Sequence, residues 1–236
     1  MVVTIINGSP RKNGATGKIL KEMAKYLESK GDVELNYVDL SEYNMRFCKG
    51  CTACFRTGEC IIKEDGLEAL SHLISRSDGL VIGSPTYESN VHGQVKTMMD
   101  RGHFVVEQLL TGKYCFAVST YENAQGRGVL KVLNRLFSYS GGIIAGNLLA
   151  KVIFNKDPFS IKGLRQELDE KMKKYYNTMK MKKQKSVVGK IFSWMILNFG
   201  FKPMVTKHVD RYEGVMKKWA AMGIVRETKL VNNHLT

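Results

Sequence analysis

The sequence predicts an α/β fold built on a doubly wound parallel sheet of five strands, followed by a basic helical extension at the C-terminus. Short apolar runs without charges alternate along the chain with segments of helical periodicity, which is the order of a parallel sheet with helices on both faces. Loops rich in glycine and hydroxyl side chains follow several of these runs. The 44% content of hydrophobic residues is enough for a folded core and excludes a disordered chain.

Five segments are predicted as strands. Met1 to Ile6 is uncharged and rich in β-branched residues, as expected of a buried central strand. Val33 to Leu40 alternates apolar and polar residues, which suits a strand nearer the edge of the sheet. The other strands are expected at Gly79 to Gly83, at Tyr114 to Val118 and within Ile143 to Phe154.

Helices are predicted between these strands because apolar residues recur there at helical spacing. The first helix carries Ile19, Leu20, Met23, Ala24 and Leu27 on its apolar face. The next helices are expected at Gly66 to Ser77, at Gly93 to about Leu110 and at Val129 to Ser138.

The net charge of +14 is concentrated in the last third of the chain. Residues 1–150 carry 17 Lys and Arg against 15 Asp and Glu, whereas residues 151–236 carry 19 against 7. We therefore expect a sheet domain over residues 1–160 and a basic helical extension over residues 161–236. The extension either attracts acidic partners or an anionic surface, or forms only a solvated lysine-rich helix face. Nucleic acid is disfavoured as a partner because no recognition motif accompanies the lysines.

The extension is expected to begin with a basic helix from Ile161 to about Lys183. It continues into eleven residues without a charge, Ile191 to Phe201. A membrane span needs about 20 apolar residues, so this run is too short to cross a bilayer. We expect it to be buried between subunits. The alternative is peripheral contact with a membrane surface through residues 171–206, where lysines flank the apolar run.

The chain opens directly with an apolar run that is followed at once by a turn. A secretory signal would have a basic leader and a longer apolar segment, so a cytoplasmic location is expected. In a reducing compartment, clustered cysteines are metal ligands or redox thiols more often than structural disulfides.

A loop rich in glycine and hydroxyl groups, GSPRKNGATG at residues 8–17, joins the first strand to the first helix. Backbone N–H groups of such a loop and of the helix N-terminus point at one spot, where an anion can bind. Ser9, Arg11 and Thr16 can add donors. The loop has neither the dinucleotide-binding pattern G-x-G-x-x-G nor the P-loop pattern, so both of those folds are disfavoured. An ordinary loop without a ligand is the alternative.

Two further loops are expected at the same edge of the sheet, at residues 84–90 and 119–128. Open α/β sheets bind ligands outside the carboxyl ends of their strands. The polar backbone of the first of these loops, together with Tyr87, suits a planar heteroaromatic ring.

Four of the five cysteines lie within thirteen residues in the pattern C-x2-C-x2-C-x5-C, at Cys48, Cys51, Cys54 and Cys60. The first three match the C-x2-C-x2-C run of bacterial ferredoxins, in which thiolates ligate iron. Four nearby thiols also suit tetrahedral zinc, although zinc ribbons usually have two separated CxxC pairs. A redox disulfide and thiols without a metal remain as alternatives. Cys115 lies inside a predicted strand and is expected to be a small buried apolar residue.

Three segments together resemble the NADPH-dependent FMN reductase family, which has a flavodoxin-like fold. They are GSPRKNGATGKIL at residues 8–20, GSPTYESNVHGQVKTMMDR at residues 83–101, and the cysteine motif between them. The resemblance covers about residues 1–150. The cysteine spacing is similar to that of the iron–sulfur flavoprotein branch.

The resemblance implies which residues contact FMN. The phosphate would be held by Ser9, Arg11, Asn13, Gly14, Ala15 and Thr16. The isoalloxazine ring and the ribityl chain would lie against Pro85, Thr86, Tyr87 and Asn90. A third flavin loop would run from Ser119 through Thr120 and Tyr121 to Gly126. This sequence departs from the family at two places: STYENAQGRG at residues 119–128 is bulkier than the usual glycine-rich loop, and Ala15 stands where asparagine is common.

The resemblance also implies a function, an FMN-dependent oxidoreductase that couples flavin chemistry to electron transfer through a [4Fe–4S] cluster at the four clustered cysteines. No protein side chain is assigned a catalytic role, because the cofactor carries the hydride chemistry. NAD(P)H is the expected donor, and the acceptor would be a redox protein or a small molecule. A homo-oligomer, a dimer or a tetramer, is implied, with the cluster of one subunit near the flavin of another.

Two other functions remain open. The first is an NAD(P)H-dependent FMN, quinone or nitro-compound reductase whose cysteines hold no cluster. The second is a non-catalytic electron carrier that docks through its basic extension to an acidic partner or a membrane surface.

Overall fold

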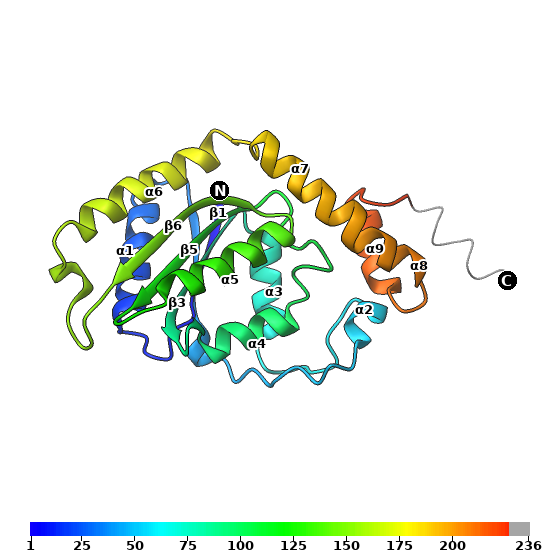
Figure 1. The fold of residues 1–236 in the computed structure, drawn as a ribbon, viewed down its shortest axis with the longest axis horizontal. Helices are drawn as coiled ribbons and strands as arrows, with labels where there is room; N and C mark the ends of the chain where they lie inside the picture. Colours follow the sequence, from blue (N-terminus) through cyan, green and yellow to red (C-terminus); the bar gives the residue numbers. More distant parts are fainter. Residues whose placement is uncertain (227–236) are drawn as a thin grey trace.

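The computed structural model describes residues 1–226 and contains a twisted parallel sheet of five strands in the order β2-β1-β3-β5-β6 (Figure 1). The strands are β1 (Val2–Asn7), β2 (Glu34–Asp39), β3 (Gly79–Tyr87), β5 (Tyr114–Tyr121) and β6 (Ile143–Lys151). This is the strand order of flavodoxin-like folds. The predicted parallel sheet is confirmed, with the second strand at its edge. A sixth strand of two residues, β4 (Asn90–Val91), pairs antiparallel with the end of β3.

Helices cover both faces of the sheet (Figure 1). On one face lie α1 (Ala15–Glu28) and α6 (Leu164–Lys180). On the other lie α3 (Leu67–Arg76), α4 (Gly93–Arg101) and α5 (Gly126–Tyr139). Successive strand residues point to opposite faces, so in β1 Val3 and Ile5 pack with α1 while Ile6 joins the second core. Both faces of the central strands are therefore buried, which explains their uncharged sequences.

The helix expected to reach about Leu110 ends earlier, since α4 stops at Arg101. His103 has a φ angle of +50°, a left-handed conformation that a right-handed helix cannot contain. Gly102 allows the tight turn, because a Cβ at this position would lie 2.1 Å from the Phe104 ring. The apolar residues after the turn, such as Phe104 and Leu110, are buried in the core without being helical. Their burial in a non-helical segment explains why the helix was predicted too long.

The basic helix α6 packs on the sheet and shares a core with it. Its apolar face, which includes Leu168, Met172 and Tyr175, packs with α1, β5 and β6 in one core. The Tyr175 hydroxyl is buried and donates to the backbone oxygen of Tyr114 at 3.0 Å. Its lysines lie on the outer face, while its inner face closes the core. The division of the chain at residue 160 remains a prediction.

After α6 the chain leaves the sheet and forms α7 (Val187–Met195), a π-helical segment η3 (Ile196–Phe201), α8 (Lys202–Lys207) and α9 (Glu213–Ala221). Figure 1 shows α7 leading away from the sheet, so that α8 and α9 lie near α2 (Ala53–Thr57). Short 3-10 turns, η1 (Leu40–Glu42) and η2 (Pro158–Ser160), complete the described elements. Residues 227–236 of the predicted extension lie outside the described residues.

The uncharged run predicted to be buried between subunits is exposed in the single chain. Phe199 is 71% exposed, and the side chains of Ile191, Trp194 and Met195 are exposed as well; Val188, just before the run, is 77% exposed. Within residues 1–226, no helix has both the length and the apolar character needed to cross a membrane.

Candidate functional site

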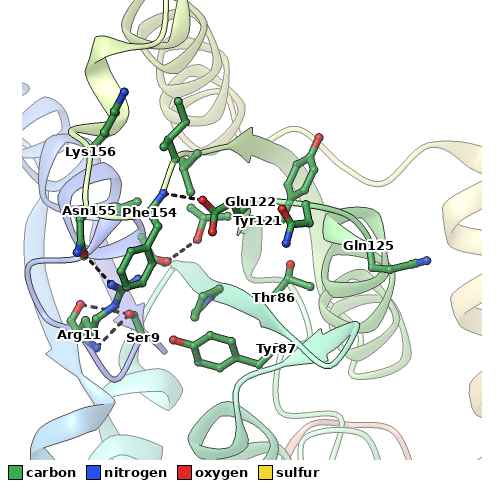
Figure 2. A pocket seen from close by; sticks show the side chains of 18 of the residues that line it. Ser9, Arg11, Thr86, Tyr87, Tyr121, Glu122, Gln125, Phe154, Asn155 and Lys156 are labelled. Atoms are coloured by element: carbon green, nitrogen blue, oxygen red, sulfur yellow. Dashed lines mark hydrogen bonds between the residues drawn. The ribbon is translucent and has the colours of Figure 1, made fainter.

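A large pocket of the described chain lies at the carboxyl ends of the sheet strands. It has a volume of about 580 Å³, within the range of cofactor and ligand sites. Four loops line it, and they follow β1, β3, β5 and β6 (Figure 2). All parallel strands end at the same edge, so segments from residues 9 to 156 meet at one site.

The loop after β1 forms the part of the pocket that suits a phosphate. Its lining residues are Ser9, Arg11, Asn13, Gly14, Ala15 and Thr16. The loop is braced by its own hydrogen bonds, in which the Ser9 hydroxyl donates to Arg11 O and accepts from Arg11 N, both at 3.2 Å. Gly14, the residue before α1, has no side chain to cap the helix, and the first turn carries no acidic residue. The N–H groups at the start of α1 are therefore left for an anion.

The loop after β3 contributes Pro85, Thr86 and Tyr87 to the pocket, together with Glu88 and Ser89. In Figure 2 the Tyr87 ring faces the pocket from below, opposite Tyr121 and Phe154. The third flavin loop contributes Thr120 and Tyr121, and the Thr120 hydroxyl lies 2.7 Å from that of Thr16. This hydroxyl pair ties the phosphate end of the pocket to β5.

Three residues that the resemblance assigned to FMN do not line this pocket. Asn90 is exposed in β4, and its side-chain oxygen accepts from Val91 N at 2.8 Å. Ser119 is buried and its hydroxyl donates to Gly126 O at 2.9 Å. Gly126 begins α5, where a Cβ would lie 2.3 Å from the Tyr121 ring. Ser119 and Gly126 thus shape the third loop from behind it.

The segment after β6 was not identified from the sequence, although it forms one wall of the pocket. Phe154, Asn155 and Lys156 lie there (Figure 2). The Arg11 guanidinium lies 4.6 Å from the centre of the Phe154 ring and donates to Asn155 Oδ1 at 3.3 Å. The fifth strand was predicted within Ile143 to Phe154, and in the structure it ends at Lys151. Because the sequence left the end of this strand undefined, the segment after it was not assigned to the ligand edge.

The four clustered cysteines lie around a second, much smaller cavity of about 20 Å³ that also borders Arg101 and His103. Their loop turns sharply, with left-handed φ angles of +65° at Gly50, +56° at Thr52 and +84° at Gly58. All five cysteines are free. Cys115 is completely buried, as predicted, and burial raises the pKa of its thiol to about 12.

The cysteine site has the donor chemistry of a thiolate-ligated centre, since all four cysteines line one small cavity. In residues 1–226, however, no group of three or more His, Cys, Asp or Glu side chains is arranged so that it could hold a metal ion. Burial, with smaller contributions from Cys60, Glu107 and Cys51, raises the pKa of Cys54 to about 11. Cys54 is therefore protonated at neutral pH, and a metal bound there would have to displace its proton, so binding would strengthen as pH rises.

Helix α9 packs against the cysteine loop. Gly214 packs so closely on the loop that a Cβ there would lie 2.1 Å from Gly58 N. The Lys218 ammonium donates to Gly58 O at 2.8 Å and to the buried Glu107 carboxylate at 2.7 Å. The Phe55 ring stacks on Tyr212, with centroids 5.5 Å apart. The C-terminal helices therefore form part of the cysteine site.

Comparison with known proteins fits this geometry. Residues 1–154 match the family model of the NADPH-dependent FMN reductases, which covers the whole sheet and the pocket-lining residues up to Phe154. The chain belongs to this family. It is a flavin-dependent oxidoreductase, and FMN is its cofactor.

Curated relatives of this FMN reductase family member are iron–sulfur flavoproteins. One from Clostridioides difficile (strain 630) is 40% identical over 226 residues, which is 95% of this chain and 100% of the relative. Another from Archaeoglobus fulgidus is 34% identical over 146 residues, 60% of this chain and 64% of the relative. This is the branch expected from the cysteine spacing.

Solved structures share the fold of this family member. The apo form of an NADH:FMN oxidoreductase aligns with a TM-score of 0.57 at 16% identity, over 75% of this chain and 89% of that one. An FMN-dependent NADH-azoreductase from Bacillus anthracis, solved with FMN, aligns with a TM-score of 0.58 at 14% identity, over 76% of this chain and 100% of that one.

The contact between Gly214 and Gly58 gives a testable prediction. Gly214→Ala places a methyl group against the loop backbone, and overpacking of this kind costs about 1–3 kcal/mol. We expect a lower free energy of unfolding in urea and faster proteolysis within the cysteine loop. Gly200→Ala is the control, because its added methyl meets no atom within 4 Å. Equal stability of the two variants would contradict the docking of α9 on the loop.

Proposed function

We propose that the protein is an iron–sulfur flavoprotein, an FMN-dependent oxidoreductase whose flavin exchanges electrons with a [4Fe–4S] cluster held by Cys48, Cys51, Cys54 and Cys60. The observation that carries the proposal is that these four cysteines line one small cavity in a chain that also has a pocket suited to FMN. When bound, FMN supplies hydride transfer and the cluster supplies one-electron transfer. NAD(P)H is the proposed electron donor, and the acceptor is a redox protein or a small molecule.

The residues of the larger pocket are suited to bind and orient FMN. The N-terminus of α1 and the Arg11 guanidinium favour a phosphate at one end. The rings of Tyr87 and Phe154, both exposed in the pocket, offer apolar surface to a flat ring system and would exclude water from it. The Thr16–Thr120 hydroxyl pair connects the start of α1 to β5.

The identity of the relatives supports the cluster, because several curated relatives are iron–sulfur flavoproteins. Sulfur is the only type of ligand that all four motif positions offer, and thiolate sulfur is what iron–sulfur clusters need. The site also carries positive charge, since the Arg101 guanidinium donates to Cys60 Sγ at 3.5 Å. A nearby cation offsets the negative charge of ligating thiolates.

A reductase without a cluster is the second candidate. It is favoured by the absence, in the described part of the chain, of a side-chain group arranged to hold a metal ion. This candidate predicts fast NAD(P)H-driven turnover of a quinone or a nitro compound by metal-free protein loaded with FMN. Loss of NAD(P)H-driven reduction of an added acceptor on removal of iron would exclude it.

Substitution of a cysteine tests the cluster. Cys54→Ser should bind FMN as well as the wild type but retain little iron after anaerobic reconstitution, because one of four ligands is lost. Iron, acid-labile sulfide and FMN are measured on each sample. Cys115→Ala is the control, since Cys115 is buried in β5 away from the cysteine loop. A Cys54→Ser protein with the iron content of the wild type would overturn the assignment of this ligand.

The phosphate end of the pocket gives another prediction. Arg11→Met removes a cation, and a charge-assisted hydrogen bond contributes about 1.5–3 kcal/mol. We expect FMN to bind about 10- to 150-fold more weakly, as measured by quenching of flavin fluorescence. Riboflavin, which lacks the phosphate, is the control and should lose little affinity. Equal losses for both flavins would show that Arg11 does not contact the phosphate.

We further propose that the protein is a homo-oligomer, a dimer or a tetramer, in the reducing cytoplasm. The exposed apolar residues of α7 and η3, among them Val188 and Phe199, support burial against a second copy. Light scattering should give the mass of a dimer or a tetramer for the wild type and that of a monomer for Val188→Asp/Phe199→Asp. A monomeric wild type would contradict the proposal.

A further inference from the structure

Arg101 is one of the largest fully buried side chains of the described residues, with 1% of its surface exposed. It is the last residue of α4 and points into the base of the cysteine loop. A charged side chain is rarely buried to this extent unless it is paired and hydrogen-bonded. The hydrogen-bond partners of Arg101 therefore show which parts of the chain it fastens together.

The guanidinium joins the two ends of the loop. Nη1 donates at 3.0 Å to the backbone oxygen of Arg46, just before the first cysteine. Nη2 donates at 3.0 Å to the backbone oxygen of Ile62, just after the last cysteine, and at 3.5 Å to Cys60 Sγ. Both nitrogens also bind the carboxylate of Asp65.

Asp65 completes this connection. Its carboxylate, which is almost fully buried, accepts from the backbone N–H of Arg46 at 3.0 Å as well as from Arg101. The Arg46 guanidinium donates in turn to Lys63 O at 2.6 Å. Residues 46 and 62–65 are thus fastened to each other mainly through one buried ion pair, and the cysteines lie on the loop between them.

We propose that Arg101 is a positioning residue for the cysteine site: it fastens the two ends of the loop and donates a hydrogen bond to the Cys60 sulfur, and thereby raises the reduction potential of the cluster. The second part rests on the proposed function. Hydrogen bonds to ligating sulfurs and the net charge near a cluster help to set its potential. A buried cation stabilises the reduced cluster, which carries one more negative charge.

Lysine could not replace these contacts. The planar guanidinium presents five donors in a fixed fork, whereas an ammonium group is a point charge with three donors. Arg101 uses Nη1 and Nη2 for four different acceptor groups at once. A lysine would keep the charge but lose most of the contacts to Arg46, Ile62 and Cys60.

The position of Arg101 also connects the cysteine loop to the flavin pocket. Helix α4 begins at Gly93, shortly after the pocket loop that contains Tyr87, and ends at Arg101. Nine helical residues span about 13 Å. A single rigid element therefore links the loop that lines the flavin pocket to the residue that fastens the cysteines.

The test compares Arg101→Lys with Arg135→Lys, which makes the same change on the exposed side of α5. In FMN-loaded, iron-free protein, hydrogen–deuterium exchange of residues 46–65 should be faster in Arg101→Lys than in the wild type and unchanged in Arg135→Lys. In reconstituted protein, a redox titration monitored by electron paramagnetic resonance should give a lower cluster potential for Arg101→Lys. FMN content should stay constant.

Asp65→Asn distinguishes an electrostatic effect of Arg101 on the cluster potential from a general loosening of the cysteine loop. It removes the negative partner and leaves the Arg101 charge near Cys60, so the cluster potential should rise, in the opposite direction to Arg101→Lys. Wild-type exchange together with a wild-type potential in Arg101→Lys would overturn the proposal, as would a shift of both variants in the same direction. A wild type that binds no iron would refute the proposed function, while the exchange comparison would still decide whether Arg101 fastens the loop.

Discussion

Parallel pairing of β3 with β1 on one side and β5 on the other places three strand ends at one edge of the sheet. At this edge Gly8 N donates to Gly83 O at 2.8 Å, where the loops after β1 and β3 separate. A Cβ at Gly8 would lie 2.8 Å from that oxygen, so the close approach requires glycine. The FMN pocket depends on this arrangement, because each of its walls is a loop that leaves the sheet there.

The cysteine loop is held in place by side-chain contacts and not by the strand pairing that forms the FMN pocket. The loop has no regular structure apart from α2, and the sheet does not include it. Two buried or partly buried cations hold it, Arg101 at its base and Lys218 near Gly58. Burial of an ion pair is costly unless hydrogen bonds satisfy it fully, so this arrangement suits a site that needs a defined geometry. The pocket and the cysteine loop are built separately and share α4.

Much of this structure could be predicted from local sequence. The strand-to-helix loop at Gly8–Thr16 and the loop at Pro85–Tyr87 have compositions that follow from their positions at strand ends, and both line the pocket. Phe154 was missed because the end of β6 is not marked by a clear breaker. The contact of Lys218 with Gly58 joins residues 160 positions apart, and no local pattern indicates it. The burial of Arg101 likewise depends on the fold, since its sequence neighbours are typical of a helix surface.

The central claim is that FMN and an iron–sulfur cluster occupy the same chain. The most direct test is the determination of FMN, iron and acid-labile sulfide on one sample of protein purified without oxygen. We predict one FMN with about four irons and about four sulfides per chain, the composition of a [4Fe–4S] cluster. One FMN per chain without iron, or with zinc at the cysteines, would contradict the claim and leave a flavin reductase whose thiols have another role.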